Sequence, residues 1–499
     1  MRTQPRIGNV VRRVLAISAS IGILFVIGCT KNSFTVGGTM SGLTGSGLVL
    51  QNNGGNNLKV SANGPFTFTT ALASGATYSV TESSQPINPG QICGVTSGSG
   101  TVTDASIDSV AVTCFTTTSA LIVTDAVNNR VLIYDAPFST GQSANVVLGQ
   151  ANFTSTITAN TAGTTASTTN FPAAIAMDSA GNLYVAEDGI CRVTQFVPPF
   201  TNGMSASLVF GQPNLTTGIC AASTSASGLG NGPTGGNLGD QVLGVIVDSS
   251  GDLWVADSGG NRVLEYKPPF GSGMAATLAI GQPDLISGRP NQGGAAPTAA
   301  TLFDPANPIF DSSGNLWIAD FGNSRVLEYS PPFATGMAAS VVVGQADFNH
   351  GSPNQGGATG ANTFDGTHGP TFDSSGNLWM ADSGNFRVLE FQPPFTTNMN
   401  ASLVLGQTDL MQSPFNKVTS PPTSATFFFP VQVSFDSNGR IFVSDKDFNR
   451  TLMFVPPFSN GMNASLVIGQ PNFTSNQVLS PPTAASQGLP LGVITAPPF

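Results

Sequence analysis

The sequence predicts an all-β protein in which one unit, repeated six times, forms a six-bladed β-propeller. Composition is the first observation: only 9% of the 499 residues are charged, and the chain contains 58 glycines and 35 prolines. Such a composition excludes long charged helices and coiled coils. The other two observations are the regular spacing of the repeats and the match between the two ends of the repeated region.

Two landmarks of the repeat recur with the same intervals. The intervals are 62, 70, 63, 62 and 63 residues for both the arginine and the closing glutamine of the unit. The arginines are Arg130, Arg192, Arg262, Arg325, Arg387 and Arg450. The glutamines are Gln150, Gln212, Gln282, Gln345, Gln407 and Gln470. Two independent landmarks therefore define six copies, and repeats of this kind indicate a solenoid, a propeller or an array.

Each copy contains four short strand patterns. In residues 310–345, FDSSGNLWIADFGNSRVLEYSPPFATGMAASVVVGQ, an apolar run ending in Asp leads into a Ser-Ser-Gly turn, and the strands LWIAD, RVLEY and ASVVVGQ follow. The aspartate at the start of the turn has a side chain that bonds to the backbone ahead of it. Four short antiparallel strands with turns between them are typical of a propeller blade.

The first copy begins at Ala120 without a first strand, and the chain ends with GLPLGVITAPPF. Residues 489–495 of this segment resemble the missing strand, as comparison with QVLGVIVDSS at 241–250 shows. We therefore expect the C-terminal strand to complete the first blade, with the propeller spanning 118–499.

Residues 29–116 contain no copy of the unit and form a separate predicted domain. Segments such as GPFTFTTAL and DSVAVTC alternate like strands between Gly/Asn turns. They predict a small β-sandwich, which resembles immunoglobulin-like or prealbumin-like modules placed between a lipid anchor and a working domain. Carbohydrate adhesion by this domain is the alternative to a purely structural role.

Residues 1–28 have the layout of a signal peptide, with four arginines before an uncharged run from Val14 to Gly28. The run is shorter than the ~20 apolar residues of a membrane span. Its end, Val-Ile-Gly-Cys29, resembles the bacterial lipobox, whose cysteine is lipidated; an ordinary signal peptide is the alternative. Thr30 in place of aspartate favours the outer membrane in the same resemblance. We expect a lipid-anchored envelope protein, periplasmic or exposed at the surface.

Cleavage before Cys29 would remove four arginines and no acids, so the formal charge would fall from −10 to −14. This acidity argues against nucleic acid as a partner. Four cysteines would remain besides Cys29, an even number that suits an oxidising compartment. We pair neighbours, Cys93 with Cys114 and Cys191 with Cys220, and the alternative is free buried thiols.

The unit resembles the NHL repeat, which carries a hydrophobic strand, a D-x-x-G-N turn, a V-A-D segment and an N-x-R-V strand. The resemblance covers about three quarters of the chain, although copies of about 63 residues exceed the usual length because the segment after each Gly-Gln is long. The second copy departs from the pattern, with Glu187 in place of the aspartate and Cys191 before the arginine. NHL propellers are mostly recognition platforms, so the resemblance implies binding.

Each copy also carries a carboxylate five residues before its arginine. Because every blade has this pair, we interpret it as a structural ion pair and not as an active site. Outside the second copy the carboxylates are Asp125, Asp257, Asp320, Asp382 and Asp445.

Catalytic chemistry is weakly represented. The two histidines, His350 and His368, do not suffice for a three-histidine zinc site. With Asp347 and Asp365 they stay candidates for an acid/base pair or partial metal site on the loop face, against the alternative of surface histidines. The Asp-Ser-Ser-Gly-Asn turns lack the ligand pattern of an EF-hand. No cofactor is predicted, and a calcium ion on the axis is left open.

The long segments after Gly-Gln occupy the same place in every copy and should therefore emerge on one face. They comprise residues 151–170, 213–240, 283–302, 346–363 and 408–426. Adaptable loops on a rigid scaffold favour a binding surface for a protein, peptide or glycan. The alternative is that these loops have only a structural role in the ring. The rival functional hypothesis is an envelope metal-dependent hydrolase or lyase of the lactonase or lyase propeller type.

Overall fold

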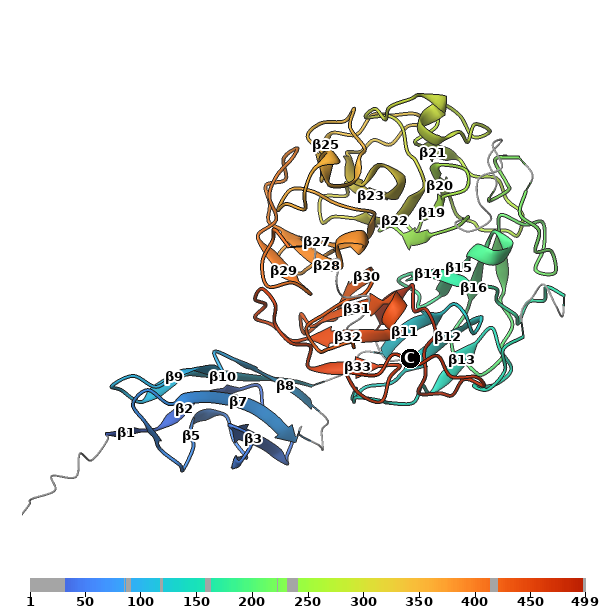
Figure 1. Ribbon diagram of the computed structural model, residues 1–499. Helices are drawn as coiled ribbons and strands as arrows, with labels where there is room; N and C mark the ends of the chain where they lie inside the picture. Colours follow the sequence, from blue (N-terminus) through green and yellow to red (C-terminus); the bar gives the residue numbers. More distant parts are fainter. Residues whose placement is uncertain are drawn as a thin grey trace, which may run out of the picture.

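A computed structural model of the protein describes residues 32–84, 86, 91–116, 120–157, 163–221, 223–230, 241–412 and 421–496. The predicted signal peptide and Cys29 lie outside these residues. The regular elements of the described chain are strands and short 3₁₀ helices, and the chain divides into an N-terminal unit and a ring of sheets (Figure 1). No helix in the described ranges is long and apolar enough to cross a membrane.

The N-terminal unit contains two four-stranded sheets and one short strand pair that share an apolar core. The first sheet has the order β5 (Gly64–Thr67), β2 (Val36–Ser41), β10 (Ile107–Thr116), β8 (Gln91–Thr96). The second has the order β4 (Asn56–Val60), β3 (Leu48–Asn52), β7 (Thr77–Ser84), β9 (Ser99–Thr101). The short pair is β1 (Ser33–Phe34) with β6 (Leu72–Ala73). The disulfide Cys93–Cys114 joins β8 to β10, where the two cysteines are directly opposite.

The repeated region is a β-propeller, with six four-stranded antiparallel sheets among the described residues. The inner strands are β34 (Val493–Ala496), β14 (Pro172–Met177), β18 (Gly244–Val247), β22 (Pro305–Phe310), β26 (Thr367–Phe372) and β30 (Pro430–Phe435). The second strands are β11 (Ala120–Asp125), β15 (Leu183–Glu187), β19 (Leu253–Asp257), β23 (Leu316–Asp320), β27 (Leu378–Asp382) and β31 (Ile441–Asp445). The third strands are β12 (Arg130–Tyr134), β16 (Arg192–Phe196), β20 (Arg262–Tyr266), β24 (Arg325–Tyr329), β28 (Arg387–Phe391) and β32 (Arg450–Phe454). The outer strands are β13 (Val146–Leu148), β17 (Leu208–Phe210), β21 (Leu278–Ile280), β25 (Val341–Val343), β29 (Leu403–Leu405) and β33 (Leu466–Ile468).

The ring is closed by contacts between neighbouring inner strands. Each inner strand contacts the inner strand of the next sheet, and β34 contacts both β30 and β14. The C-terminal strand β34 pairs antiparallel with β11, with Ile494 opposite Ile122. This is the closure that the C-terminal sequence predicts.

The second and third strands are buried on both sides because adjacent sheets pack face to face. The second strands are therefore apolar runs that end in a carboxylate, as in LWIAD, rather than alternating patterns. Trp317 on β23 illustrates the packing, since its ring lies 4.9 Å from that of Phe395 and 5.8 Å from that of Phe372 in the next sheet. Large aromatic side chains thus fill the space between sheets.

The turn between the inner and second strands is built by its aspartate. In the fourth sheet, Oδ1 of Asp311 accepts hydrogen bonds from the backbone N–H groups of Ser313 and Asn315 at 2.8 and 2.9 Å. Its Oδ2 accepts from Nε1 of Trp317 at 3.1 Å. Gly314 takes a φ of 82° in this turn, a conformation that glycine adopts without steric cost. The Asp-Ser-Ser-Gly-Asn segment is accordingly a hairpin turn in the structure.

Six 3₁₀ helices complete the described elements. Four of them connect the second and third strands: η1 (Asp188–Ile190), η3 (Phe321–Asn323), η5 (Ser383–Asn385) and η7 (Lys446–Phe448). The other two, η2 (Pro290–Gly293) and η4 (Pro353–Gly356), lie in the long segments after Gly-Gln. The disulfide Cys191–Cys220 ties the end of η1 to such a segment, and both predicted disulfide pairings are thus formed.

Candidate binding face and axial pocket

The antiparallel order of the strands places two sets of connections on one side of the ring. An inner strand runs away from this side, the second strand returns to it, the third runs away and the outer strand returns. The long segments after Gly-Gln therefore lie on the same side as the helices η1, η3, η5 and η7. We call this side the loop face, and the Pro-Pro-Phe connections lie on the opposite side.

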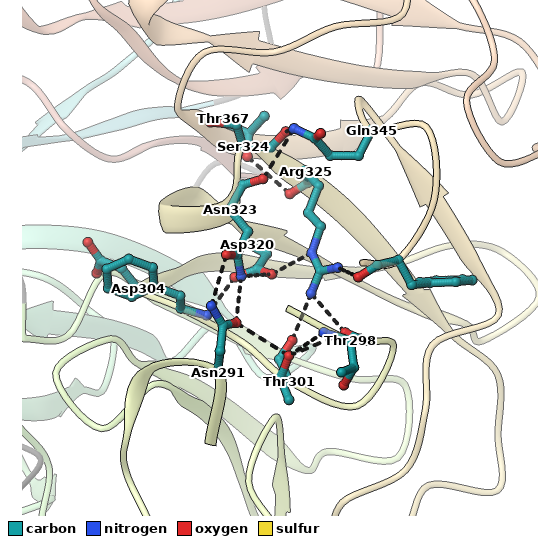
Figure 2. Close-up of polar contacts among 12 residues, drawn as sticks. Asn291, Thr298, Thr301, Asp304, Asp320, Asn323, Ser324, Arg325, Gln345 and Thr367 are labelled. Carbon is teal, nitrogen blue, oxygen red and sulfur yellow. Dashed lines mark hydrogen bonds and ion pairs between the residues drawn. The ribbon is translucent and has the colours of Figure 1, made fainter. Parts of the chain in front are cut away.

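A buried ion pair anchors the long segments to each sheet. In the fourth sheet, Nε of Arg325 lies 2.7 Å from Oδ2 of Asp320, and both side chains are inaccessible to solvent (Figure 2). The guanidinium also donates to the backbone carbonyls of Thr298 and Thr301, in the preceding long segment, at 2.9 and 3.0 Å. A further bond at 2.5 Å reaches the carbonyl of Phe348 in the following long segment. One arginine thus holds two loops.

The carboxylate completes the anchor. Oδ1 of Asp320 accepts a hydrogen bond from the backbone N–H of Phe303, at the entry to β22, at 2.7 Å. Oδ2 also accepts from the side-chain amide of Asn323 at 2.7 Å. The Gly-Gln glutamine adds a third tie, because Nε2 of Gln345 donates to the carbonyls of Ser324 and Ser352. Local polar side chains therefore provide hydrogen-bond partners for many backbone N–H and carbonyl groups of the loops.

The same ion pair occurs in all six sheets. The pairs are Asp125–Arg130, Glu187–Arg192, Asp257–Arg262, Asp320–Arg325, Asp382–Arg387 and Asp445–Arg450. Even the departure in the second sheet keeps the contact, since the longer Glu187 reaches Arg192 at 3.0 Å. Burial raises the pKa of each of these carboxyls, and the adjacent guanidinium opposes that shift. The pairs face the loops that they anchor and are closed to solvent, so they have no access to a ligand.

Exposed apolar side chains concentrate on the loop face. Among the described residues, nine large apolar side chains are exposed, and Val197 is the one that lies on the opposite side. The eight on the loop face are Val127, Ile157, Ile219, Ile286, Phe303, Met411, Val478 and Leu479. The most exposed are Ile219 (75%), Ile286 (67%) and Met411 (67%), which lie in three different long segments. The exposed apolar side chains are thus divided unequally between the two sides of the ring.

The sequence-predicted candidates Asp347 and His350 form an exposed pair on this face. Nδ1 of His350 lies 2.7 Å from Oδ1 of Asp347, with side chains 62% and 49% exposed. A hydrogen bond from the backbone N–H of Asn349 lowers the pKa of Asp347, and His350 adds to this effect. An exposed ion pair contributes little to stability, and its geometry is that of a surface pair.

The other two candidates, Asp365 and His368, do not join this pair. Asp365 is half-buried, and burial raises the pKa of its carboxyl. His368 is 8% exposed on the inner strand β26, not in a surface loop, because its strand lines the axis of the ring. The described residues contain no group of three or more His, Cys, Asp or Glu side chains that could hold a metal ion.

His368 belongs to a pocket at the axis, with a volume of about 170 Å³. All six sheets contribute to it, through residues on or beside their inner strands. Its walls are Phe171, Ala173, Leu243, Asn307, His368, Phe429, Val431, Lys446 and Leu491. Six of these side chains are apolar, and the amide, the imidazole and the ammonium supply the polar contacts. Because inner strands begin at the loop face, this pocket opens at the centre of that face.

Neighbouring residues hold the imidazole of His368 in place. Its Nδ1 lies 2.9 Å from Oγ of Ser383, and its ring centroid lies 4.4 Å from that of Phe321 and 5.9 Å from that of Phe429. Burial lowers the pKa of His368 to about 3, and the positive charge of Lys446 adds to this effect. The imidazole is therefore neutral at physiological pH.

Sequence reasoning missed the axial pocket and three of its polar or aromatic residues, Asn307, Phe429 and Lys446. A signal was present in the repeats. The positions that match His368 in the other sheets hold Leu491, Ala173, Leu243, Ala306 and Val431. A single histidine among small or apolar residues, once the repeats are aligned, singles out this position.

No family model and no curated protein matches the chain. Solved structures resemble it at low sequence identity. A protein of unknown function from Bacteroides caccae has a TM-score of 0.43 at 9% identity, covering 76% of this chain and 98% of its own. Virginiamycin B lyase from Staphylococcus aureus has a TM-score of 0.32 at 12% identity, covering 58% of this chain and 71% of its own. The identities and TM-scores are both low, so these likenesses support no functional assignment.

Proposed function

We propose that the protein is an envelope-anchored binding platform, an NHL-like six-bladed propeller whose loop face recognises a protein, peptide or glycan. The observation that carries the proposal is the placement of eight of the nine exposed large apolar side chains on that face. The buried ion pairs support it, since they hold the loops in place before a partner arrives. A preorganised surface loses less conformational entropy on binding.

The proposal also includes the cellular localisation of the protein. Two disulfides favour an oxidising compartment outside the cytoplasm. We assign residues 1–28 to a lipoprotein signal peptide, Cys29 to lipid attachment and the outer membrane to the anchor. Residues 29–116 would then form a β-sandwich stalk between the anchor and the propeller.

A protein or peptide partner fits the exposed surface better than a glycan. Ile219, Ile286 and Met411 are aliphatic and expose 67–75% of their surface, whereas sugars present mostly hydroxyl groups. A metal-dependent hydrolase or lyase is the alternative function, and the described residues contain no group of three or more His, Cys, Asp or Glu side chains that could hold its metal ion.

Site-specific photo-crosslinking in the native envelope tests this proposal. A photoreactive amino acid replaces Ile219 or Ile286 on the loop face, or Val197 on the opposite face. Val197 is the matched control because it is also aliphatic and 44% exposed. We expect a discrete crosslinked species from the two loop positions and none from the control. Absence of a crosslink at both loop positions, or an equal yield at Val197, would contradict the proposal.

A further inference from the structure

The axial pocket contains a hydrogen-bond acceptor, Nε2 of His368. The hydrogen bond between Ser383 and Pro430 identifies it. Oγ of Ser383 lies 2.6 Å from the carbonyl oxygen of Pro430 and donates its hydrogen to it. A serine hydroxyl has a single hydrogen, so Oγ of Ser383 must accept from Nδ1–H of His368. A neutral imidazole carries one hydrogen, and Nε2 of His368 therefore presents a lone pair.

The pocket also contains a cation that makes no direct ion pair, although its charge acts on the adjacent Asp447. Nζ of Lys446 lies 4.8 Å from the ring centroid of Phe429, and none of the ion pairs within the described residues includes it. The side chain is half-buried. By contrast, the six repeat arginines, Arg440 and Lys267 all have carboxylate partners. A half-buried ammonium beside apolar walls favours an anion.

The remaining walls define the shape of a ligand. Apolar groups come from Phe171, Ala173, Leu243, Phe429, Val431 and Leu491, and the amide of Asn307 is the third polar contact. A volume of about 170 Å³ is close to that of an engineered apolar cavity of about 150 Å³ that binds benzene. The pocket therefore suits a compound with a few carbon atoms and excludes a folded partner.

We propose that the axial pocket binds a small organic carboxylate with a short apolar body and a hydroxyl group. Lys446 and Asn307 bind the carboxylate, Nε2 of His368 accepts the hydroxyl hydrogen, and the apolar body contacts the aliphatic and aromatic walls. This site goes beyond the proposed recognition of a macromolecule, because a ligand of this size does not contact Ile219 or Ile286 on the long loops.

Calorimetric titration of the full chain tests the assignment with three probes. The probe 2-hydroxyisovalerate has all three features, 2-hydroxyisovaleramide lacks the charge, and isovalerate lacks the hydroxyl. We expect the amide to bind at least about ten-fold more weakly than the hydroxy acid, as befits loss of a charge-assisted contact. Isovalerate should also bind more weakly than the hydroxy acid.

Variants assign these preferences to residues. Lys446→Gln should weaken binding of 2-hydroxyisovalerate by about ten-fold or more, whereas Lys59→Gln, at an exposed lysine of β4, should leave it unchanged. His368→Leu places the residue of the matching position in the first sheet, Leu491, in the pocket, so its fold should be retained. In this variant the hydroxy acid and isovalerate should bind equally.

The assignment is wrong if the wild-type protein binds none of the three probes, or if the amide binds as tightly as the acid. It is also wrong if Lys446→Gln binds like the wild type while its thermal unfolding is unchanged. These variants leave the crosslinking positions on the long loops intact. Titration therefore tests the pocket ligand, and crosslinking independently tests the loop-face proposal.

Discussion

Nε of Arg325 lies 2.7 Å from Oδ2 of Asp320, and the same contact recurs in each of the other five sheets at 2.6–3.0 Å. Each pair is fully buried, and each arginine also binds carbonyl groups of the flanking long loops. The repeated charge pair is therefore the means by which a ring with few charged residues fixes its loop face.

Replacing Asp320 with asparagine should destabilise the propeller by about 3–5 kcal/mol, because the guanidinium of Arg325 would be left buried without a counter-charge. Equilibrium unfolding in urea, followed by tryptophan fluorescence, measures the change. Asp135→Asn is the control, since Asp135 is exposed. An equally small effect of both substitutions would show that the pair does not support the loops as argued.

Removing the Cys191–Cys220 bond with a double alanine substitution should lower propeller stability by about 3–4 kcal/mol. The bond closes a segment with a sequence separation of 29 residues, and the cross-link restricts the unfolded chain. The matched variant without Cys93 and Cys114 should shift the unfolding of the N-terminal unit and leave that of the propeller unchanged. A propeller transition that is insensitive to the loss of Cys191 and Cys220 would contradict the prediction.

The sheets and their closure could be predicted because every copy of the repeat uses the same local chemistry. Asp311 starts a turn that its own side chain stabilises, and Arg325 follows Asp320 at a spacing that places the two opposite each other on β23 and β24. Such signals lie within a few residues. The long loops also share one side of the ring, because a sheet of four antiparallel strands starts and ends on the same side.

The axial pocket could not be predicted in the same way. Its residues are separated by about a repeat length, and each sheet contributes a different side chain, from Phe171 to Leu491. Alignment of the repeats singles out His368, but no local motif marks the other pocket residues. The alternative of a surface histidine does not fit His368, because β26 starts directly after a long polar segment and the ring places this part of the strand at the axis.

Substitution of Cys29 by serine should release the protein from the membrane fraction, because the thiol is the attachment point of the proposed lipid. Fractionation of cells and intact-mass measurement of the purified wild type check this directly. The wild type should carry the mass of an acylated cysteine, with residues 1–28 removed. A soluble wild-type protein, or a variant that stays in the membrane, would contradict lipid anchoring at this residue.

The acid stability of the propeller should depend on His368. Its pKa is about 3 in the folded protein and about 6.5 in an unfolded chain, so the unfolded state binds more protons between these values. Stability should therefore fall as the pH decreases through 6.5, by up to about 1.4 kcal/mol per pH unit. More than about one pH unit above 6.5 the histidine should contribute almost no pH dependence, because it is neutral in both states.

Urea unfolding at pH 6.5 and 4.5 tests this linkage. His368→Leu should lose about 2–3 kcal/mol less than the wild type over this interval, because the leucine does not titrate. His350→Leu is the matched control, since the ring of His350 is 62% exposed and does not line the axis. Equal losses in the wild type and in His368→Leu would mean that the imidazole is not held neutral. The proposed role of Nε2 as a hydrogen-bond acceptor in the axial pocket requires this neutral form. The pH series therefore tests that requirement in the absence of any ligand.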